Sequence, residues 1–400
     1  MDSDTKRSRI REIIEQETRG EIYKTHKYSL ETNDPSAVEY GEVNANIQWK
    51  RRGETKSIRD YVPLFELSKK VKGIQLFSYF LDGSRHVYKV YEMSFEKSGN
   101  RKAIYPIIAG QIGVGCCRRE NKQMFKEKLR KEIVVAMPDI AQTSAKKQGF
   151  LVQIAHKLNE SNEMERIGKS GWLFSTVLPY KSVKEEKDYN DKGTAQIQTR
   201  MMKNEQDMVA ELVSEKKLNN ANFLVKDGSL EYRPTAEMRT NERKYQEFKN
   251  KYDYVIGVSK RFNPESCLVL GDKPNPGYIA DIPLYNRTAA AYFTDSEILG
   301  NIGFAVWYIR IRHQKYTRSV FDGIVKVEKI LVTQEEVREG MDSDLIDLIS
   351  AHIINERNPV SYGNDARWAN HLYAVHLTEQ YVKSHYLSTA SFLQLFEGGR

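Results

Sequence analysis

The sequence predicts an α/β protein built on one mixed sheet flanked by helices. Three observations support this fold class. Strand patterns follow one another with short connections between residues 74 and 114, which indicates an antiparallel meander. Farther along, strand and helix patterns alternate, which favours parallel pairing. In both parts an apolar strand pattern runs into the same tripeptide, Asp-Gly-Ser, at residues 82–84 and 227–229.

The meander begins with a strand over residues 74–81 that closes on Asp82. Gly83 and Ser84 then indicate a turn, because Gly and Ser break a strand pattern. The second strand, 86–91, alternates polar and apolar residues as a half-buried strand does, and the third covers 103–114.

The second part delivers another acid from a buried strand. Residues 196–217 contain neither Pro nor Gly and predict a helix. The apolar run 223–226 then leads into Asp227, and Gly228 and Ser229 again indicate a turn. The remaining predicted elements are a helix at 235–251, a strand at 254–260, a hairpin of 302–312 with 320–331, and helices at 342–355 and 365–384.

We divide the chain into an N-terminal helical extension, residues 1–70, and a main domain, residues 71–400. The extension carries a thin apolar stripe, Ile10, Ile13 and Ile14, at helical spacing, which suits a helix lying across the domain or against a partner chain. It ends in a short helix at 58–70. An insertion is predicted at about 116–195, with a basic helix at 120–132, a strand at 150–155 and a polar loop at 181–193.

Composition restricts the partners and the cellular compartment expected for the protein. The 400 residues include 62 Lys and Arg against 54 Asp and Glu, a net charge of +8 that leans toward a polyanionic partner. Cys116, Cys117 and Cys267 form no disulfide framework or metal clip. No apolar run reaches the roughly 18 residues of a membrane span, and the first residues lack the apolar core of a signal peptide. We therefore expect a soluble, cytoplasmic protein.

The two Asp-Gly-Ser endings suggest a metal site. A mixed sheet with one acid on its first strand and one on its fourth is the ribonuclease-H-like arrangement, in which these strands lie side by side. Asp82 and Asp227 would then lie close together. Two negative charges at such a short separation repel each other unless a cation lies between them. Carboxylate oxygens are ligands for hard divalent ions, so a divalent metal is the natural occupant. Each tripeptide alone is most often a turn signal.

Several short elements together resemble the NurA nuclease family, whose fold is ribonuclease-H-like and whose partner is the hexameric HerA translocase. They occur in the family's order over roughly residues 74–385. The matching elements are Phe80-Leu-Asp-Gly-Ser-Arg85, Leu224-Val-Lys-Asp-Gly-Ser-Leu230, Val255-Ile-Gly-Val-Ser-Lys260, the strand Phe304 to Arg312 with its partner ending in Val325-Lys-Val-Glu328, and a final helix that bears a histidine.

The resemblance implies a set of site residues. Asp82 is similar to the first metal-binding acid of the family and Asp227 to the third. The second is a glutamate on the preceding helix, for which Glu205 fits best and Glu211 is the alternative. The family's last helix carries an aromatic residue and, two turns on, a histidine. Trp368 and His376 hold that spacing here, with tryptophan where the family usually has tyrosine.

Phosphodiester hydrolysis explains the chemistry of these residues. Two divalent ions roughly 3.5–4 Å apart activate water and neutralise the phosphate, and Asp and Glu hold them. Arg85 and Lys260 are the expected phosphate contacts. His376 as a ligand suits Mn²⁺ better than Mg²⁺. In the alternative interpretation Glu205 is a solvated helix residue, His376 a core histidine, and Arg85 and Lys260 surface charges.

Two functions follow from the resemblance. The first is a DNA nuclease that depends on Mn²⁺ or Mg²⁺ and works with a HerA-type ATPase in DNA end processing or anti-phage defence. The second is a DNA-binding or assembly subunit of such a complex that has lost catalysis. The chain has no GxxxxGK[ST] loop, so movement on DNA needs a separate motor. We expect a homodimer that docks on the ATPase ring, with the N-terminal helix as a candidate contact.

Overall fold

The structure is a computed structural model of the whole chain. It describes residues 9–23, 25–30, 48–58, 61–97, 101–145, 150–183, 188–230, 238, 240–264, 275–294, 302–357 and 366–397. Cys267 lies outside these residues, whereas Cys116 and Cys117 are buried free thiols. None of the helices in the described ranges is both long and apolar enough to cross a membrane.

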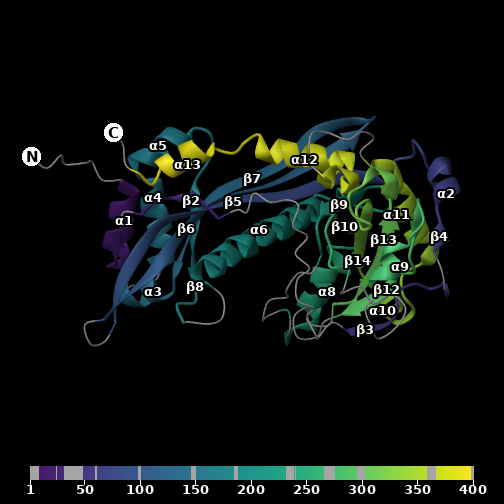
Figure 1. Cartoon of the computed structure of the whole chain (residues 1–400), viewed down its shortest axis with the longest axis horizontal. Helices are drawn as coiled ribbons and strands as arrows, with labels where there is room; N and C mark the ends of the chain where they lie inside the picture. Colours follow the sequence, from purple (N-terminus) through teal and green to yellow (C-terminus); the bar gives the residue numbers. More distant parts are fainter. Residues whose placement is uncertain are drawn as a thin grey trace, which may run out of the picture.

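The molecule is elongated, and long strands connect its two ends (Figure 1). The strands are β1 (Glu21–Tyr23), β2 (Tyr28–Ser29), β3 (Gln48–Arg52), β4 (Val62–Pro63), β5 (Phe77–Lys97), β6 (Arg101–Glu120), β7 (Gln123–Pro138), β8 (Phe174–Tyr180), β9 (Phe223–Asp227), β10 (Val255–Ser259), β11 (Asn286–Arg287), β12 (Ala291–Thr294), β13 (Phe304–Arg310) and β14 (Ile324–Ile330). All of them belong to one mixed sheet.

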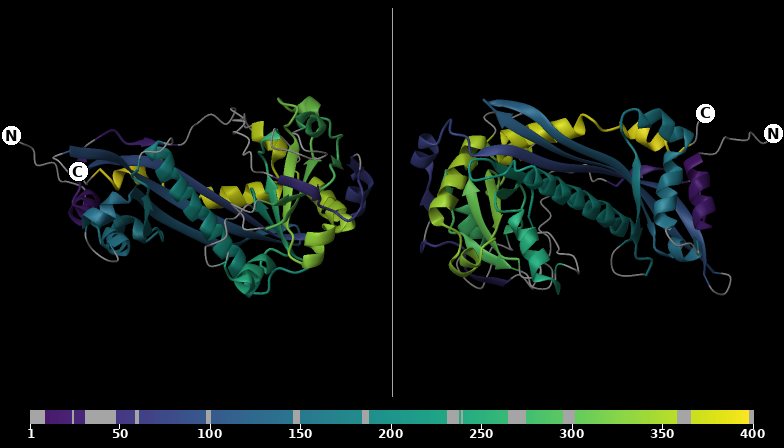
Figure 2. Two further views of the ribbon diagram at one scale, coloured as in Figure 1. Left: turned by 90° about the horizontal axis from the view of Figure 1, so that it is seen from below. Right: turned by 180° about the vertical axis from the view of Figure 1, so that it is seen from behind.

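Helices cover the sheet on both sides and close its two ends (Figure 2). They are α1 (Arg9–Thr18), α2 (Phe65–Lys70), α3 (Ile140–Ala145), α4 (Phe150–Asn159), α5 (Asn162–Gly168), α6 (Tyr189–Ser214), α8 (Glu242–Asn250), α9 (Pro276–Ala280), α10 (Gln334–Glu339), α11 (Ser343–Glu356), α12 (Tyr373–Lys383) and α13 (Thr389–Gln394), with the 3₁₀ turns η2 (Gln314–Tyr316) and η3 (Ala366–Asn370). The predicted fold class, a mixed sheet flanked by helices, is confirmed.

The centre of the sheet confirms one predicted neighbour relation, that of the first and fourth predicted strands. The path runs β14-β10-β9-β5-β6-β7-β8, with β5, β6 and β7 antiparallel. β9 is parallel to β5 on one side and to β10 on the other. The first and fourth strands of the predicted sheet, β5 and β9, are therefore neighbours. β13 and β14 pair antiparallel, as the predicted hairpin requires.

The meander differs from the prediction in where its strands begin and end. The turn expected at Gly83-Ser84 does not exist, because β5 continues through it as one strand of 21 residues. The predicted strands at 74–81 and 86–91 are two parts of this strand. β6 pairs with it from Tyr79 to Lys97 and supplies the hydrogen bonds that keep the chain extended.

Two elements predicted within the insertion are wrong. Residues 120–132, predicted as a basic helix, lie largely in β7, because this charge-rich segment pairs with β6 along its length. Residues 150–155, predicted as a strand, begin helix α4. Its buried residues Phe150, Ile154 and Leu158 recur at the helical spacing of four. The polar loop predicted at 181–193 gives way to α6 at Tyr189.

The residues before 70 are tied to the rest of the chain, although the boundary itself stays a prediction. The isoleucines of α1 are buried in the core that covers the far half of β5 and β6, so the apolar stripe packs inside this chain. β1 and β2 pair with β5, β3 with β12, and β4 with β11.

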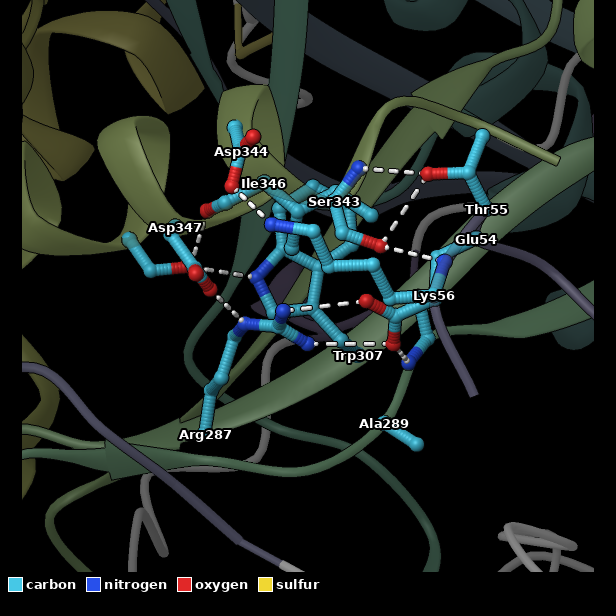
Figure 3. Close-up of polar contacts among 12 residues, drawn as sticks. Glu54, Thr55, Lys56, Arg287, Ala289, Trp307, Ser343, Asp344, Ile346 and Asp347 are labelled. Atoms are coloured by element: carbon cyan, nitrogen blue, oxygen red, sulfur yellow. Dashed lines mark hydrogen bonds and ion pairs between the residues drawn. The ribbon is translucent and has the colours of Figure 1, made fainter. Parts of the chain in front are cut away.

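A buried ion-pair network anchors the segment after β3 (Figure 3). Arg287 on β11 and Glu54 are both fully buried and meet through two hydrogen bonds of 3.0 and 3.1 Å. Asp347 on α11 accepts from Arg287 Nε at 2.5 Å. A buried arginine needs such partners, since an unpaired buried charge is strongly destabilising. The network therefore joins residues from three distant parts of the sequence.

Candidate functional site

The candidate site lies where β9 ends beside β5. Leu81 and Lys226 are paired in the parallel register, so Asp82 and Asp227 follow at the same level on adjacent strands. Asp82 is 5% exposed, and Asp227 lies at the end of β9 with its side chain 18% exposed. The structure thus brings together the two acids that the sequence singles out.

The two faces of the sheet carry different helices at this point. A Cβ at Gly110 would meet Ile197 of α6, whereas one at Gly113 or Gly115 would meet Val382 of α12. Side chains alternate along a strand, so α6 and α12 lie on opposite faces. Asp82 pairs with Gly115 and shares its face, the one covered by α12.

On the α12 face, Lys260 is the cation among the acids. It follows β10, and its Nζ lies 2.7 Å from Asp227 Oδ2 and 3.6 Å from Glu379 Oε2. Burial disfavours the charged ammonium, but the carboxylates of Asp227, Asp82 and Glu379 outweigh burial and raise the pKa of Lys260. Lys260 therefore stays charged and neutralises part of this cluster.

Asp82 is the acid of this cluster whose negative charge is least neutralised by neighbouring groups. Within the described part of the chain, no hydrogen bond or ion pair reaches its carboxylate. Burial first, and then the charge of Asp227, raise the pKa of the Asp82 carboxyl well above its usual value, against the opposing effect of Lys260. A buried carboxyl beside a second carboxylate is a position at which a bound cation stabilises the ionised form.

Glu379 on α12 is a site residue that the sequence analysis missed. It is 8% exposed, and its other oxygen accepts from Lys383 at 2.7 Å. Burial disfavours its ionised form, yet Lys260 and Lys383 lower the pKa of Glu379 to about 2. A signal was present in the sequence, because Glu379 lies one helical turn after His376 and shares its side of the helix.

The two histidines form a layer beside these acids. His376 is half-buried, and its ring stacks on that of His371 with centroids 5.4 Å apart. Burial and the charge of Lys260 lower the pKa of His371 to about 4, so it is neutral at pH 7. His376 thus adjoins the acid cluster through His371, and its role as a metal ligand stays a prediction.

The aromatic partner expected on the same helix lies elsewhere. The predicted helix 365–384 is two elements, η3 and α12, so Trp368 and His376 do not share one helix. The Trp368 ring packs under the Arg312 guanidinium, 4.5 Å from its centroid. The neighbouring Asn370 donates to the Lys260 carbonyl at 2.8 Å and so positions the lysine.

Glu205 lies on the other face of the sheet. It is 3% exposed, and its Oε2 pairs with the buried Lys226 at 3.1 Å. A Cβ at Gly83 would come within 2.4 Å of Glu205 Oε1, so the missing side chain allows α6 to approach β5 closely here. Burial raises the pKa of Glu205, and Lys226 opposes this shift. Lys226 was also missed, although a lysine within an apolar strand run is itself a signal.

The other predicted residues are placed away from the acid pair. Arg85 donates to Gln198 of α6 at 2.6 Å, on the same face as Glu205. Glu211, the alternative to Glu205, is 42% exposed and pairs with Arg130 and Lys128 near the far end of α6.

The turn after Asp227 is held from β14. Glu328 is 1% exposed, and its Oε2 accepts from Ser229 Oγ at 2.8 Å and from the Leu230 backbone N–H at 2.7 Å. Its other oxygen pairs with Lys326. Although burial opposes ionisation, Lys326 and these hydrogen bonds lower the pKa of Glu328.

The donor atoms fit a hard divalent cation, since they are carboxylate oxygens around an uncompensated buried Asp82. In this structure the ammonium of Lys260 lies near Asp227 and Glu379 and neutralises part of their negative charge. Among the residues that the structure describes, no three His, Cys, Asp or Glu side chains are placed to hold a metal ion. A metal would therefore have to displace Lys260 from between Asp227 and Glu379.

Comparisons with known proteins give a similarity of chain path and no match of sequence. No protein-family model matches the sequence, and no curated protein matches it. Among solved structures, the fold is similar to the crystal structure of the NurA nuclease from Sulfolobus solfataricus. The two chains are 11% identical, the match covers 83% of this chain and 88% of that chain, and the TM-score is 0.39. The functional argument therefore rests on the residues of the site.

Proposed function

We propose that this protein is a divalent-metal-dependent DNA nuclease of the NurA type. The observation that carries the proposal is the pairing of Asp82 and Asp227 on adjacent strands, with Asp82 buried and uncompensated. Such a pair favours a bound divalent cation, and carboxylate-held metals are the usual catalysts of phosphodiester hydrolysis. The resemblance of the sequence elements to the NurA family gives the reaction.

The chain's own residues would share the work of the site. Asp82 and Asp227 would hold Mn²⁺ or Mg²⁺, which when bound neutralises charge on the phosphate and lowers the pKa of water. Once displaced, Lys260 would contact a phosphate oxygen as a compact point charge. His371, neutral at pH 7, and His376 lie beside the cluster.

A groove beside the site supports a nucleic acid as the partner. Its volume is about 620 Å³, and it opens where α12 begins, six residues before Glu379. Exposed Lys72 and Lys122 line it together with the rings of Phe65, Tyr285 and Tyr373. Cations interleaved with aromatic rings suit the phosphates and bases of a single strand.

The proposal is tested with linear DNA, Mn²⁺ and EDTA. The wild-type protein should cleave DNA with Mn²⁺ and stop in EDTA. Asp227→Asn should reduce cleavage by about three orders of magnitude or more, because the metal supplies most of the transition-state charge stabilisation. DNA binding in EDTA, measured by fluorescence anisotropy, should persist. Near-normal cleavage by a folded Asp227→Asn protein would refute the assignment.

One observation favours a second function, a DNA-binding or assembly subunit without catalysis. Lysines already pair with Asp227 and Glu205, where a nuclease would use metal ions. This function predicts DNA binding by the wild-type protein with no cleavage in Mn²⁺ or Mg²⁺. The same assay therefore separates the two functions.

The partnership with a HerA-type hexameric ATPase, the homodimer, and a role in end processing or anti-phage defence rest on the sequence resemblance. Because the apolar side of α1 is buried within the chain, a docking contact through α1 would use its polar side. Co-expression with such an ATPase, followed by size-exclusion chromatography, tests the partnership. Separate peaks across salt conditions would count against it.

A further inference from the structure

The sheet itself divides the acids of the site into two groups. Asp82, Asp227 and Glu379 meet on the face covered by α12, where Lys260 lies among them. Glu205 lies on the face covered by α6, in contact with Gly83 and paired with Lys226. Because β5 and β9 separate the two groups, one ion held by Asp82 and Asp227 is reached more directly from α12 than from α6.

Glu379 is suited to be the third ligand. Its Oε2 is buried and accepts no hydrogen bond in the described part of the chain, and its nearest cation is Lys260 at 3.6 Å. The same ammonium lies 2.7 Å from Asp227. Two carboxylates that share one lysine can share a divalent ion in its place, drawn closer by the shorter metal–oxygen bonds of about 2.1 Å.

We propose that a divalent cation binds between Asp82, Asp227 and Glu379 on the α12 face, and that Lys260 neutralises this site when the metal is absent. The carboxylate of Asp82 is 5% exposed, shares the α12 face, and receives no hydrogen bond or ion pair in the described part of the chain, which is the independent sign of a missing cation. The inference builds on the proposed function, because it names the ligands of that function's metal.

The proposal gives Glu205 a different task. It neutralises Lys226, which is 4% exposed and whose ammonium also donates to the Asp227 carbonyl at 2.8 Å. Lys226 thereby ties α6 to the end of β9. Glu205 is a positioning residue, and its loss should affect folding stability and leave the metal site intact.

Mn²⁺ binding to the EDTA-treated, dialysed full-length protein, measured by calorimetry and by Mn²⁺ EPR without DNA, compares the two glutamates. Glu379→Gln should weaken binding about tenfold or more, because a charged oxygen ligand is lost. Glu205→Gln should bind Mn²⁺ within about twofold of wild type and melt at a lower temperature, since buried Lys226 loses its partner. Glu211→Gln, on the same helix but away from the site, is the matched control and should change neither.

Lys260→Met removes the competing cation. It should bind Mn²⁺ about tenfold more tightly, because the ion no longer displaces an ammonium. Its melting temperature in EDTA should fall below that of wild type, and Mn²⁺ should raise it by more than in wild type. This variant also decides the question if Glu379→Gln does not fold.

Three results would overturn the proposal. They are no Mn²⁺ binding by the wild type, unchanged or weaker binding by Lys260→Met, and a loss of binding in Glu205→Gln that equals or exceeds that in Glu379→Gln. The nuclease assay is independent of all three. Metal binding with the expected pattern but no cleavage would leave this inference standing and refute the nuclease. Cleavage of DNA together with metal binding that depends on Glu205 would support the nuclease and refute this inference.

Discussion

Asp82-Gly83-Ser84 and Asp227-Gly228-Ser229 have the same three residues and different backbones. The first lies inside β5, where Gly83 pairs with Val114. The second ends β9, where Gly228 has φ +87°, a left-handed conformation that favours glycine. The glycine therefore serves close packing against Glu205 in one copy and a bend of the chain in the other.

The neighbours of each copy explain the difference. β6 runs beside β5 well past Ser84, so every residue there can continue the ladder. On the other side of β9, β10 ends at Ser259, one residue past the partner of Asp227, and the Gly228 N–H donates to the Val258 carbonyl at 2.9 Å. Glu328 then accepts from Ser229 and Leu230. The same tripeptide becomes a strand or a turn according to what its neighbouring strands offer.

The largest expected effect falls on the second copy. Glu328→Gln weakens the charged anchor of Ser229 and Leu230 and removes the buried carboxylate that pairs with half-buried Lys326. We expect a loss of about 3–5 kcal/mol in the free energy of unfolding, the usual cost of breaking a buried pair. Urea denaturation measures it.

The matched control removes a contact beside the first copy. Gln198→Ala deletes the acceptor of Arg85, a half-buried contact, and should cost about 1 kcal/mol or less. Equal losses in the two variants would show that the second copy needs no anchor from β14.

The two aspartates should respond in opposite directions when metal is absent. Asp82→Asn removes a buried carboxyl without a partner and should raise the free energy of unfolding by roughly 1–3 kcal/mol in EDTA at pH 7. Asp227→Asn takes from Lys260 its nearest carboxylate and should lower it by a similar amount. Thermal melts in EDTA compare the two proteins with wild type.

The effect at Asp82 should depend on pH with a definite sign. Its pKa is raised in the folded state, so the folded protein holds this proton more tightly than the unfolded chain does. The penalty is absent below the ordinary value of 3.8 and develops as pH rises through the raised folded value. The advantage of Asp82→Asn should therefore shrink as pH is lowered toward 4, and an advantage independent of pH would contradict the assignment.

The sequence could predict the sheet centre but not all of its edges. That β5 and β9 are strands could be predicted because each contains an apolar run that ends in an acid. This pattern is visible in the sequence without knowing which strands pair. Residues 120–132 could not be assigned in this way, because Lys, Glu, Arg and Leu favour helix while pairing with β6 imposes a strand.

The candidate site was partly predictable for a related reason. Asp82 and Asp227 stand out because each interrupts an apolar pattern. The faces on which their neighbours lie depend on the register of β5 against β9 and on which helix covers which side. Those are tertiary facts, so Glu205 was grouped with the aspartates and Glu379 was missed.

The two glycines should have modest effects on stability, and the causes of these effects can be separated. Gly228→Ala should cost about 1–2 kcal/mol from its left-handed backbone alone, since the nearest atom to a new Cβ is Lys226 Nζ at 3.5 Å. Gly83→Ala should cost a similar amount for another reason, because its Cβ would displace Glu205 from Lys226. Shortening Glu205 makes room only for the second change. In the Glu205→Ala background, Gly83→Ala should add less than about 0.5 kcal/mol, whereas Gly228→Ala should keep its full cost. Urea denaturation of the three single and two double variants measures these differences, and equal additivity at both positions would mean that Gly83, too, is constrained by its backbone.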